Sequence, residues 1–308
     1  MKHTLKFLLT VLLFTQTLTT FAQQDQMYIA YPFMPLNINP AYAGSREVIS
    51  VSGIYRKRPL FGALGVASTT QQYFNFDMPI AQDRMAIGFQ AYNAEQVIGN
   101  GTSGVLGNLG LYGDFAYRLT LPNDGKLAIG VQLGVTQIPI SISLGSGASG
   151  NTSFNASYGA GIYYNNDDAY FGVSLLNINA SDVYNRPLFI SGGYVFTIDD
   201  EFKIKTGAVL RKQSSNFGGK TVFDLNATGW IKDKFGIGVW YQNTGSEIST
   251  QSILGSFQIQ LKKFQLGYAY DFSGSGNTNT ISNEGFHQIM LKYEIDAGNG
   301  KSGVFRYF

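Results

Sequence analysis

Hydrophobic and polar positions alternate in long segments of the chain. From Asn108 to Leu121 the odd positions are mostly apolar, and polar or small side chains lie between them. Successive side chains of a strand point to opposite faces of a sheet, so this pattern predicts a strand with one apolar and one polar face. The alternation recurs in residues 85–92, 127–136, 202–211 and 264–272. The chain is therefore predicted to be all-β.

The connections between these segments are alternately short and long. The short ones are predicted at Ile80 to Gln82, Pro122 to Gly125, Asn165 to Asp168, Asp199 to Glu201, Lys232 to Lys234 and Lys262 to Lys263. The longer ones are predicted at Pro59 to Gly65, Glu95 to Leu106, Ser143 to Asn155, Asn179 to Arg186, Ser214 to Lys220, Thr244 to Ser249 and Ser273 to Gly285. These connections join about 14 strands, an even number that places both chain ends on one side.

This arrangement is typical of a transmembrane antiparallel up-and-down β-barrel of the outer membrane, with short periplasmic turns and longer outer loops. Closure satisfies every backbone polar group in lipid. A soluble two-sheet sandwich also shows alternating strands. A sandwich fold does not explain why short and long connections alternate along the chain. The barrel is therefore the preferred interpretation.

Composition agrees with strands and turns, because the chain has 37 Gly, 19 Tyr, 23 Phe and no Cys. The N-terminus has Lys2, Lys6, an apolar run and the small Ala22, which predict a signal peptide over residues 1–22. We expect an N-terminal segment at 23–46, the barrel at 47–296 and a tail at 297–308. Without Lys2 and Lys6 the 22 Lys and Arg become 20 and balance the 20 Asp and Glu, which argues against nucleic acid as a partner.

Catalysis finds little support in the sequence. The chain has two histidines, and His3 leaves with the signal peptide. His287 alternates with the apolar positions that follow it and so is predicted to face lipid. We expect no cofactor, no metal site and no enzymatic activity.

Charged residues on the polar faces of the predicted strands are candidates for lining the barrel lumen. They are Asp114, Arg118, Lys203, Lys205, Arg211 and Asp271. If the lumen is open, these side chains predict a diffusion channel or small-solute transporter.

The segment 23–46 lies outside the strand pattern and contains Asn39-Pro40-Ala41-Tyr42-Ala43-Gly44. Pro40 fixes its own φ and holds Asn39 in extended geometry, and Gly44 can take a positive φ. The segment is interpreted either as a turn that delivers the first strand or as a plug or periplasmic docking segment. The candidate residues for plugging or partner binding are Tyr28, Tyr31, Asn37, Asn39, Pro40, Tyr42 and Gly44.

The same motif, together with Tyr55-Arg56, Phe76-Asp77-Met78-Pro79 and the final Arg306-Tyr307-Phe308, resembles the PorP/SprF family. These are outer-membrane proteins of the type IX secretion system and gliding apparatus of Bacteroidetes. The chain departs from the family at Met34-Pro35, where an Asn-Pro pair is usual. Phe308 is typical of a barrel insertion signal. The intervening tail, Asp296 to Gly303, favours instead a periplasmic contact near the N-terminal segment.

The resemblance implies a protein that binds a secreted adhesin-like partner with a type B C-terminal domain, and that helps to export it or anchor it at the cell surface. It also implies other type IX secretion components as partners, and outer-membrane lipid around the barrel. Both termini are expected in the periplasm and the loops outside. We expect the partner to contact the loops Glu95 to Leu106, Ser143 to Asn155 and Ser273 to Gly285.

Overall fold

The computed structural model describes residues 31–62, 65–97, 105–122, 124–139, 152–179, 186–214, 221–243, 251–272, 281–283, 285–298 and 307–308. These residues form one antiparallel sheet and two short 3-10 turns, η2 (Pro35–Asn37) and η3 (Pro40–Tyr42). The strands are β1 (Ile49–Gly62), β2 (Gly65–Ile80), β3 (Met85–Val97), β4 (Val105–Thr120), β5 (Lys126–Pro139), β6 (Thr152–Asn165), β7 (Ala169–Leu175), β8 (Arg186–Thr197), β9 (Phe202–Ser214), β10 (Thr221–Ile231), β11 (Phe235–Asn243), β12 (Gln251–Leu261), β13 (Phe264–Asp271), β14 (Ile281–Asn283) and β15 (His287–Ile295).

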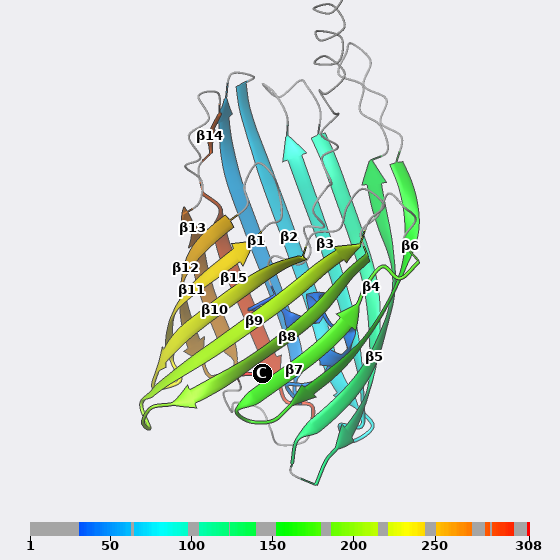
Figure 1. Ribbon diagram of the computed structural model, residues 1–308, viewed down its shortest axis with the longest axis vertical. Coiled ribbons are helices and arrows are strands. Elements are labelled where there is room, and N and C mark those ends of the chain that lie inside the picture. The colour runs from blue at the N-terminus through cyan, green and yellow to red at the C-terminus, as the bar shows by residue number, and fades with distance from the viewer. Residues whose placement is uncertain are drawn as a thin grey trace, which may run out of the picture.

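The sheet closes into a barrel (Figure 1). From β1 to β13 each strand pairs with the next in sequence, β13 then pairs with β15, and β15 closes the ring by pairing with β1. β14 pairs with residues 60–62 of β1, and β15 pairs with residues 49–57, so β14 and β15 are two parts of one crossing. The 15 strand segments therefore make one crossing fewer, and the predicted barrel of 14 strands is confirmed.

The two faces of the strands differ as the alternation predicts. The outer face carries large apolar side chains, such as Leu133 at 62% exposure and Ile237 at 65%. The inner face carries buried polar side chains such as Gln90 and Asp271, each 1% exposed. An apolar exterior around a polar interior is the arrangement that a barrel in lipid requires.

The six short turns gather at one end of the barrel, the lower end in Figure 1. Two of them use an Asx turn. The Asp199 side chain accepts hydrogen bonds from the backbone N–H groups of Glu201 and Phe202 at 2.8 and 2.7 Å. Asn166 does the same for the residues that follow it. Asp199 and Asn166 therefore stabilise the backbone of these two turns.

The longer connections leave the opposite end and lie mostly outside the described residues. The prediction of a long loop from Pro59 to Gly65 was wrong, because β1 continues to Gly62 and β2 begins at Gly65. Pro59 remains in the ladder opposite Ser68, and its other side faces the break between β14 and β15. At such a break a missing backbone N–H costs no ladder hydrogen bond.

The barrel interior is occupied by the chain that precedes β1. Residues 31–48, here called the inner segment, lie within the ring of strands towards the short-turn end (Figure 1). All of them except Pro32 and Pro35 are buried. In the described part of the chain, no helix has the length and apolar character needed to cross a bilayer.

Candidate functional site: the barrel interior

The inner segment is shaped by two of its three prolines. Pro35 and Pro40 each begin a 3-10 turn, where a missing backbone N–H and a fixed φ are both tolerated. Asn39 caps the second turn by accepting a hydrogen bond from the N–H of Ala41 at 3.0 Å. Gly44 has φ +67°, as its position before the first strand predicts. The segment therefore folds compactly enough to fit inside the barrel.

Hydrogen bonds join the inner segment to the wall on several sides. Asn39 also donates to the carbonyl of Ile162 at 2.9 Å, and Asn37 accepts from Asn75 at 2.7 Å. Further contacts run from Gln90 to the carbonyl of Leu36 at 3.0 Å, from the N–H of Gly44 to Asp77 at 2.9 Å, and from Ser174 to the carbonyl of Ile38. Polar backbone groups of a buried, non-helical segment need partners, and the polar inner face of the strands supplies them.

Small wall residues leave room for this close approach. A Cβ at Gly130 of β5 would lie 2.4 Å from the backbone nitrogen of Ala41. Ala86, Ala116 and Ala128 pack in one buried cluster with the inner segment. Tyr42 lies in the same cluster, with its ring edge-on to Tyr163 at 5.4 Å. Burial raises the pKa of the Tyr42 hydroxyl, so this side chain stays neutral.

One buried ion pair joins the end of the inner segment to the last strand. Arg46 lies 2.5 Å from Glu294 of β15, and both side chains are 5% exposed. Burial lowers the pKa of Arg46, but the charge and hydrogen bond of Glu294, together with Tyr42, raise it by more, so the guanidinium remains charged. Removing one member of such a pair leaves an uncompensated buried charge.

Asp114 and Arg118 of β4 were predicted to line the lumen, and both point inward and are buried. Asp114 accepts hydrogen bonds from Gln90 at 2.7 Å and from Gln132 at 3.0 Å. Arg118 donates to the carbonyl of Gly44 in the inner segment. Within the described residues, these two charges contact protein groups rather than an open channel.

Arg211 and Asp271, also predicted to line the lumen, lie nearer the long-loop end. Asp271 is 3.6 Å from Arg56, whose guanidinium lies 3.7 Å from the centre of the Phe286 ring. Arg211 donates to the carbonyl of Asn243 at 3.1 Å. Both charged groups therefore contact other residues of the barrel wall.

The remaining lumen candidates are Lys203 and Lys205 of β9. Both lie close to the C-terminal residues Tyr307 and Phe308. Lys203 pairs with Asp233 at 3.0 Å, and Lys205 donates to the carbonyl of Tyr307 at 2.6 Å. Phe308 is buried, with its ring centre 4.7 Å from that of Tyr170. Tyr307 and Phe308 therefore lie in the barrel interior, outside the described strands.

Comparisons with known proteins identify the family. A model of the family described as type IX secretion system membrane protein PorP/SprF matches residues 20–293. The chain belongs to the PorP/SprF family. The resemblance found in the sequence is thereby confirmed. No curated protein sequence matches this PorP/SprF chain.

Solved structures place the PorP/SprF chain among outer-membrane β-barrels. It is similar to the Pseudomonas putida toluene transporter TodX, with a TM-score of 0.50 and 8% identity over 87% of this chain and 94% of that chain. A TodX deletion mutant, described as a monoaromatic hydrocarbon channel, gives a TM-score of 0.51 and 10% identity over 84% and 93%. A Pseudomonas aeruginosa FadL homologue gives 0.49 and 12% over 83% and 92%. At these identities the similarity shows the fold alone.

The candidate residues of the N-terminal segment lie together in this PorP/SprF barrel. Tyr31, Asn37, Asn39, Pro40, Tyr42 and Gly44 belong to the inner segment, and Tyr28 lies outside the described residues. Tyr31 accepts a hydrogen bond from Asn226 of β10 at 3.3 Å, and burial raises the pKa of its hydroxyl. These residues contact the wall of their own barrel.

Sequence reasoning missed several charged residues of the PorP/SprF interior. They are Arg46, Arg56, Asp77, Asp224, Lys292 and Glu294. The strand residues among them lie on the inner face, so the alternation pattern applied to every strand would have found them. Arg46 precedes the first strand, and no periodic signal marks it.

The described part of the PorP/SprF chain shows no group of three or more acidic, histidine or cysteine side chains that would hold a metal ion. His287 is exposed on the outer face, where its Nδ1 is 2.8 Å from the hydroxyl of Tyr268. The side chain therefore lies on the predicted side of the wall.

Proposed function

We propose that this protein is a non-enzymatic outer-membrane component of the type IX secretion system that binds a secreted adhesin-like partner with a type B C-terminal domain. It helps to export this partner or holds it at the cell surface, next to other secretion components. Family membership supports this proposal. The observation that carries it furthest is the filled interior, because a barrel occupied by its own inner segment acts through its exposed ends rather than through its lumen.

Connection lengths support one orientation of the barrel. Outer-membrane barrels keep short turns in the periplasm and longer loops outside. We therefore assign the six short turns, the inner segment and the final residues to the periplasmic end. This leaves the long-loop end to face the partner.

The diffusion channel is the second candidate. A barrel of 14 strands is wide enough for a lumen, and the toluene transporter and the hydrocarbon channel have similar folds. Conduction here would require the inner segment to leave its contacts with Asn75, Gln90 and Ile162. For this reason we favour the binding function.

Loop deletion tests the binding function. The predicted partner loops, Glu95 to Leu106, Ser143 to Asn155 and Ser273 to Gly285, lie largely outside the described residues. Each loop is shortened separately, and the variant protein is expressed in cells. Immunoblotting of whole cells and of the medium then measures how much secreted partner stays at the cell surface. We expect at least one deletion to release the partner into the medium.

The matched control changes the other end of the barrel. Lys262→Ala with Lys263→Ala alters an exposed two-residue turn between β12 and β13 and is expected to leave retention unchanged. Resistance of each variant to unfolding in SDS before heating verifies that the barrel has assembled. Unchanged retention in all three assembled deletion variants would overturn the proposal.

A further inference from the structure

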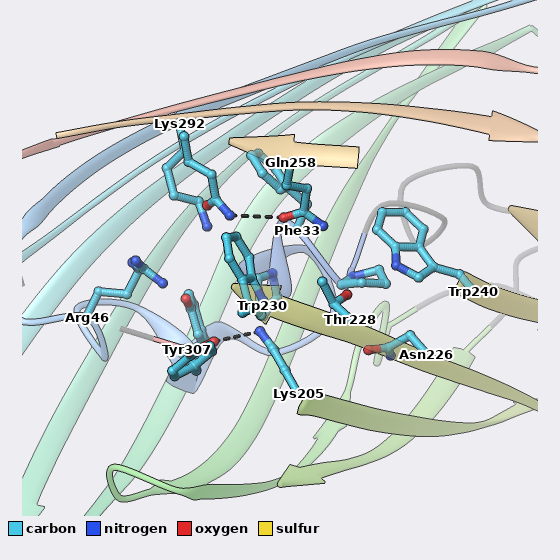
Figure 2. Close-up of a pocket in the computed structure, with 14 residues that line it drawn as sticks. Phe33, Arg46, Lys205, Asn226, Thr228, Trp230, Trp240, Gln258, Lys292 and Tyr307 are labelled. Carbon is cyan, nitrogen blue, oxygen red and sulfur yellow. Dashed lines mark hydrogen bonds between the residues drawn. The ribbon is translucent and has the colours of Figure 1, made fainter. Parts of the chain in front are cut away.

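A positively charged cavity lies where the inner segment meets the wall formed by β9 to β15 (Figure 2). Its lining includes Arg46 from the inner segment, Lys205 from β9 and Lys292 from β15. The described residues that line it include no Asp or Glu. Three segments that are far apart in sequence thus bring cationic groups to one space.

The three cations are not equally compensated. Arg46 pairs with Glu294 at 2.5 Å. No ion pair among the described residues involves Lys205 or Lys292. The two ammonium groups therefore lack the direct ion pair that Arg46 has.

The contacts of the two lysines are neutral. Lys292 is 6% exposed, and its ammonium lies 4.7 Å from the centre of the Phe33 ring. The ammonium of Lys205 contacts the carbonyl of Tyr307 at 2.6 Å and lies 4.9 Å from the ring centre of Phe308. A carbonyl and aromatic faces attract a cation without cancelling its charge.

A buried charge is costly unless an opposite charge or hydrogen bonds compensate it. Gln258 adds a neutral donor to the lining. Its amide oxygen accepts from Gln265 at 3.0 Å, which leaves its NH₂ group as a donor (Figure 2). Two ammonium groups and an amide donor around one space are the chemistry that recognises an oxyanion.

The size of the space restricts the ligand. The cavity has a volume of about 30 Å³. A cavity of this size holds a few waters or one small anion. It does not hold a folded domain or a lipid.

We propose that this cavity binds a small tetrahedral oxyanion of the phosphate or sulfate type, held by Lys205 and Lys292 with Arg46 at its edge. The anion neutralises both lysines and links β9 and β15 to the inner segment, because Phe33 and Arg46 line the same space. Binding therefore stabilises the inner segment in its place. This site is independent of the loops at the opposite end.

The test titrates inorganic phosphate into the full-length barrel in detergent and follows the thermal unfolding midpoint, with phosphorus NMR line broadening as a second readout. Ionic strength is held constant with sodium chloride. We expect a saturable rise of the midpoint, since a ligand that binds only the folded state stabilises it. Lys292→Gln and Lys205→Gln should each weaken phosphate binding roughly tenfold or more, because each removes a charged hydrogen-bond donor.

The matched control is Lys203→Gln, on the same face of β9 but paired with Asp233 outside the cavity lining. It should bind phosphate like the unchanged protein. Line broadening keeps the test informative if a variant has an altered stability of its own. The absence of saturation, an equal effect of chloride, or equal losses in Lys203→Gln and Lys292→Gln would each overturn the proposal.

Discussion

The inner faces of β3 and β4 are built differently towards their two ends. Near the short turns, Ala86 and Ala116 pair across the two strands, and both are fully buried against the inner segment. Further along the same face, Tyr92 and Tyr112 stack with ring centres 6.3 Å apart. We call the first region the small-residue wall and the second the aromatic wall.

The difference shows how one barrel face is filled in two ways. At the small-residue wall the space is occupied by a segment from outside the sheet. At the aromatic wall the strands contribute much of the filling with their own side chains, in a cluster that also includes Phe33 and Met34 of the inner segment. Periodicity reveals which face points inward, whereas side-chain volume along that face indicates where another segment fits.

Deleting residues 23–45 should have the largest effect. A barrel of 14 strands is too wide for its own side chains to fill, so removing the inner segment should leave a water-filled path. Conductance in planar bilayers is expected to rise from background to the level of an open pore. Steady conductance through the intact protein would favour the diffusion channel instead. Unchanged conductance of an assembled deletion variant would show that the aromatic wall closes the lumen without the inner segment.

Tyr92→Ala should produce the next largest effect, by breaking the aromatic wall alone. Tyr92 is 5% exposed and lies between Tyr73 and Tyr112, so truncation leaves a cavity. Loss of a large buried aromatic side chain costs about 3 to 5 kcal/mol. Urea unfolding in lipid vesicles measures this loss, with Tyr55→Ala on the exposed outer face as the comparison variant. Equal losses in both variants would contradict the packing role of the aromatic wall.

Gly130→Ala tests the small-residue wall in the opposite direction, by adding volume. The new Cβ would lie 2.4 Å from the backbone nitrogen of Ala41, where no flexible side chain can move away. Overpacking of this kind costs about 1 to 3 kcal/mol of unfolding free energy.

The control for Gly130→Ala is Gly107→Ala, because a Cβ at Gly107 would meet no atom within 4 Å. It should be close to neutral in the same urea titration. Limited proteolysis should also cut the inner segment faster in Gly130→Ala than in the control. Equal stability and equal proteolysis of the two variants would refute the close fit at Ala41.

Much of the barrel is predictable from sequence because strand parity and turn chemistry are local. Asp199 bonds to the backbone within the next three residues, so its turn can be recognised locally. Asp114 and Arg118 lie at the polar positions of an alternating strand, which assigns them to the inner face. The continuation of β1 through Pro59 was missed, because the break in its other neighbour lies more than 200 residues away in sequence. The pairing of Arg46 with Glu294, across 248 residues, depends on closure of the whole ring and has no local signal.

Asn39→Ala should have the smallest of these effects. The substitution removes the cap of the second 3-10 turn at Ala41 and the hydrogen bond to the carbonyl of Ile162. Loss of a capping side chain costs about 0.5 to 2 kcal/mol.

Asn39→Asp separates the two contacts, because it keeps the oxygen that accepts from Ala41 but loses the nitrogen that donates to the wall. We expect urea titration to place Asn39→Asp no higher in stability than Asn39→Ala, since an added carboxylate would face the carbonyl of Ile162 in a buried site. Full stability of Asn39→Asp would mean that the local cap alone holds this turn, and that the small-residue wall accepts the segment by shape without this hydrogen bond.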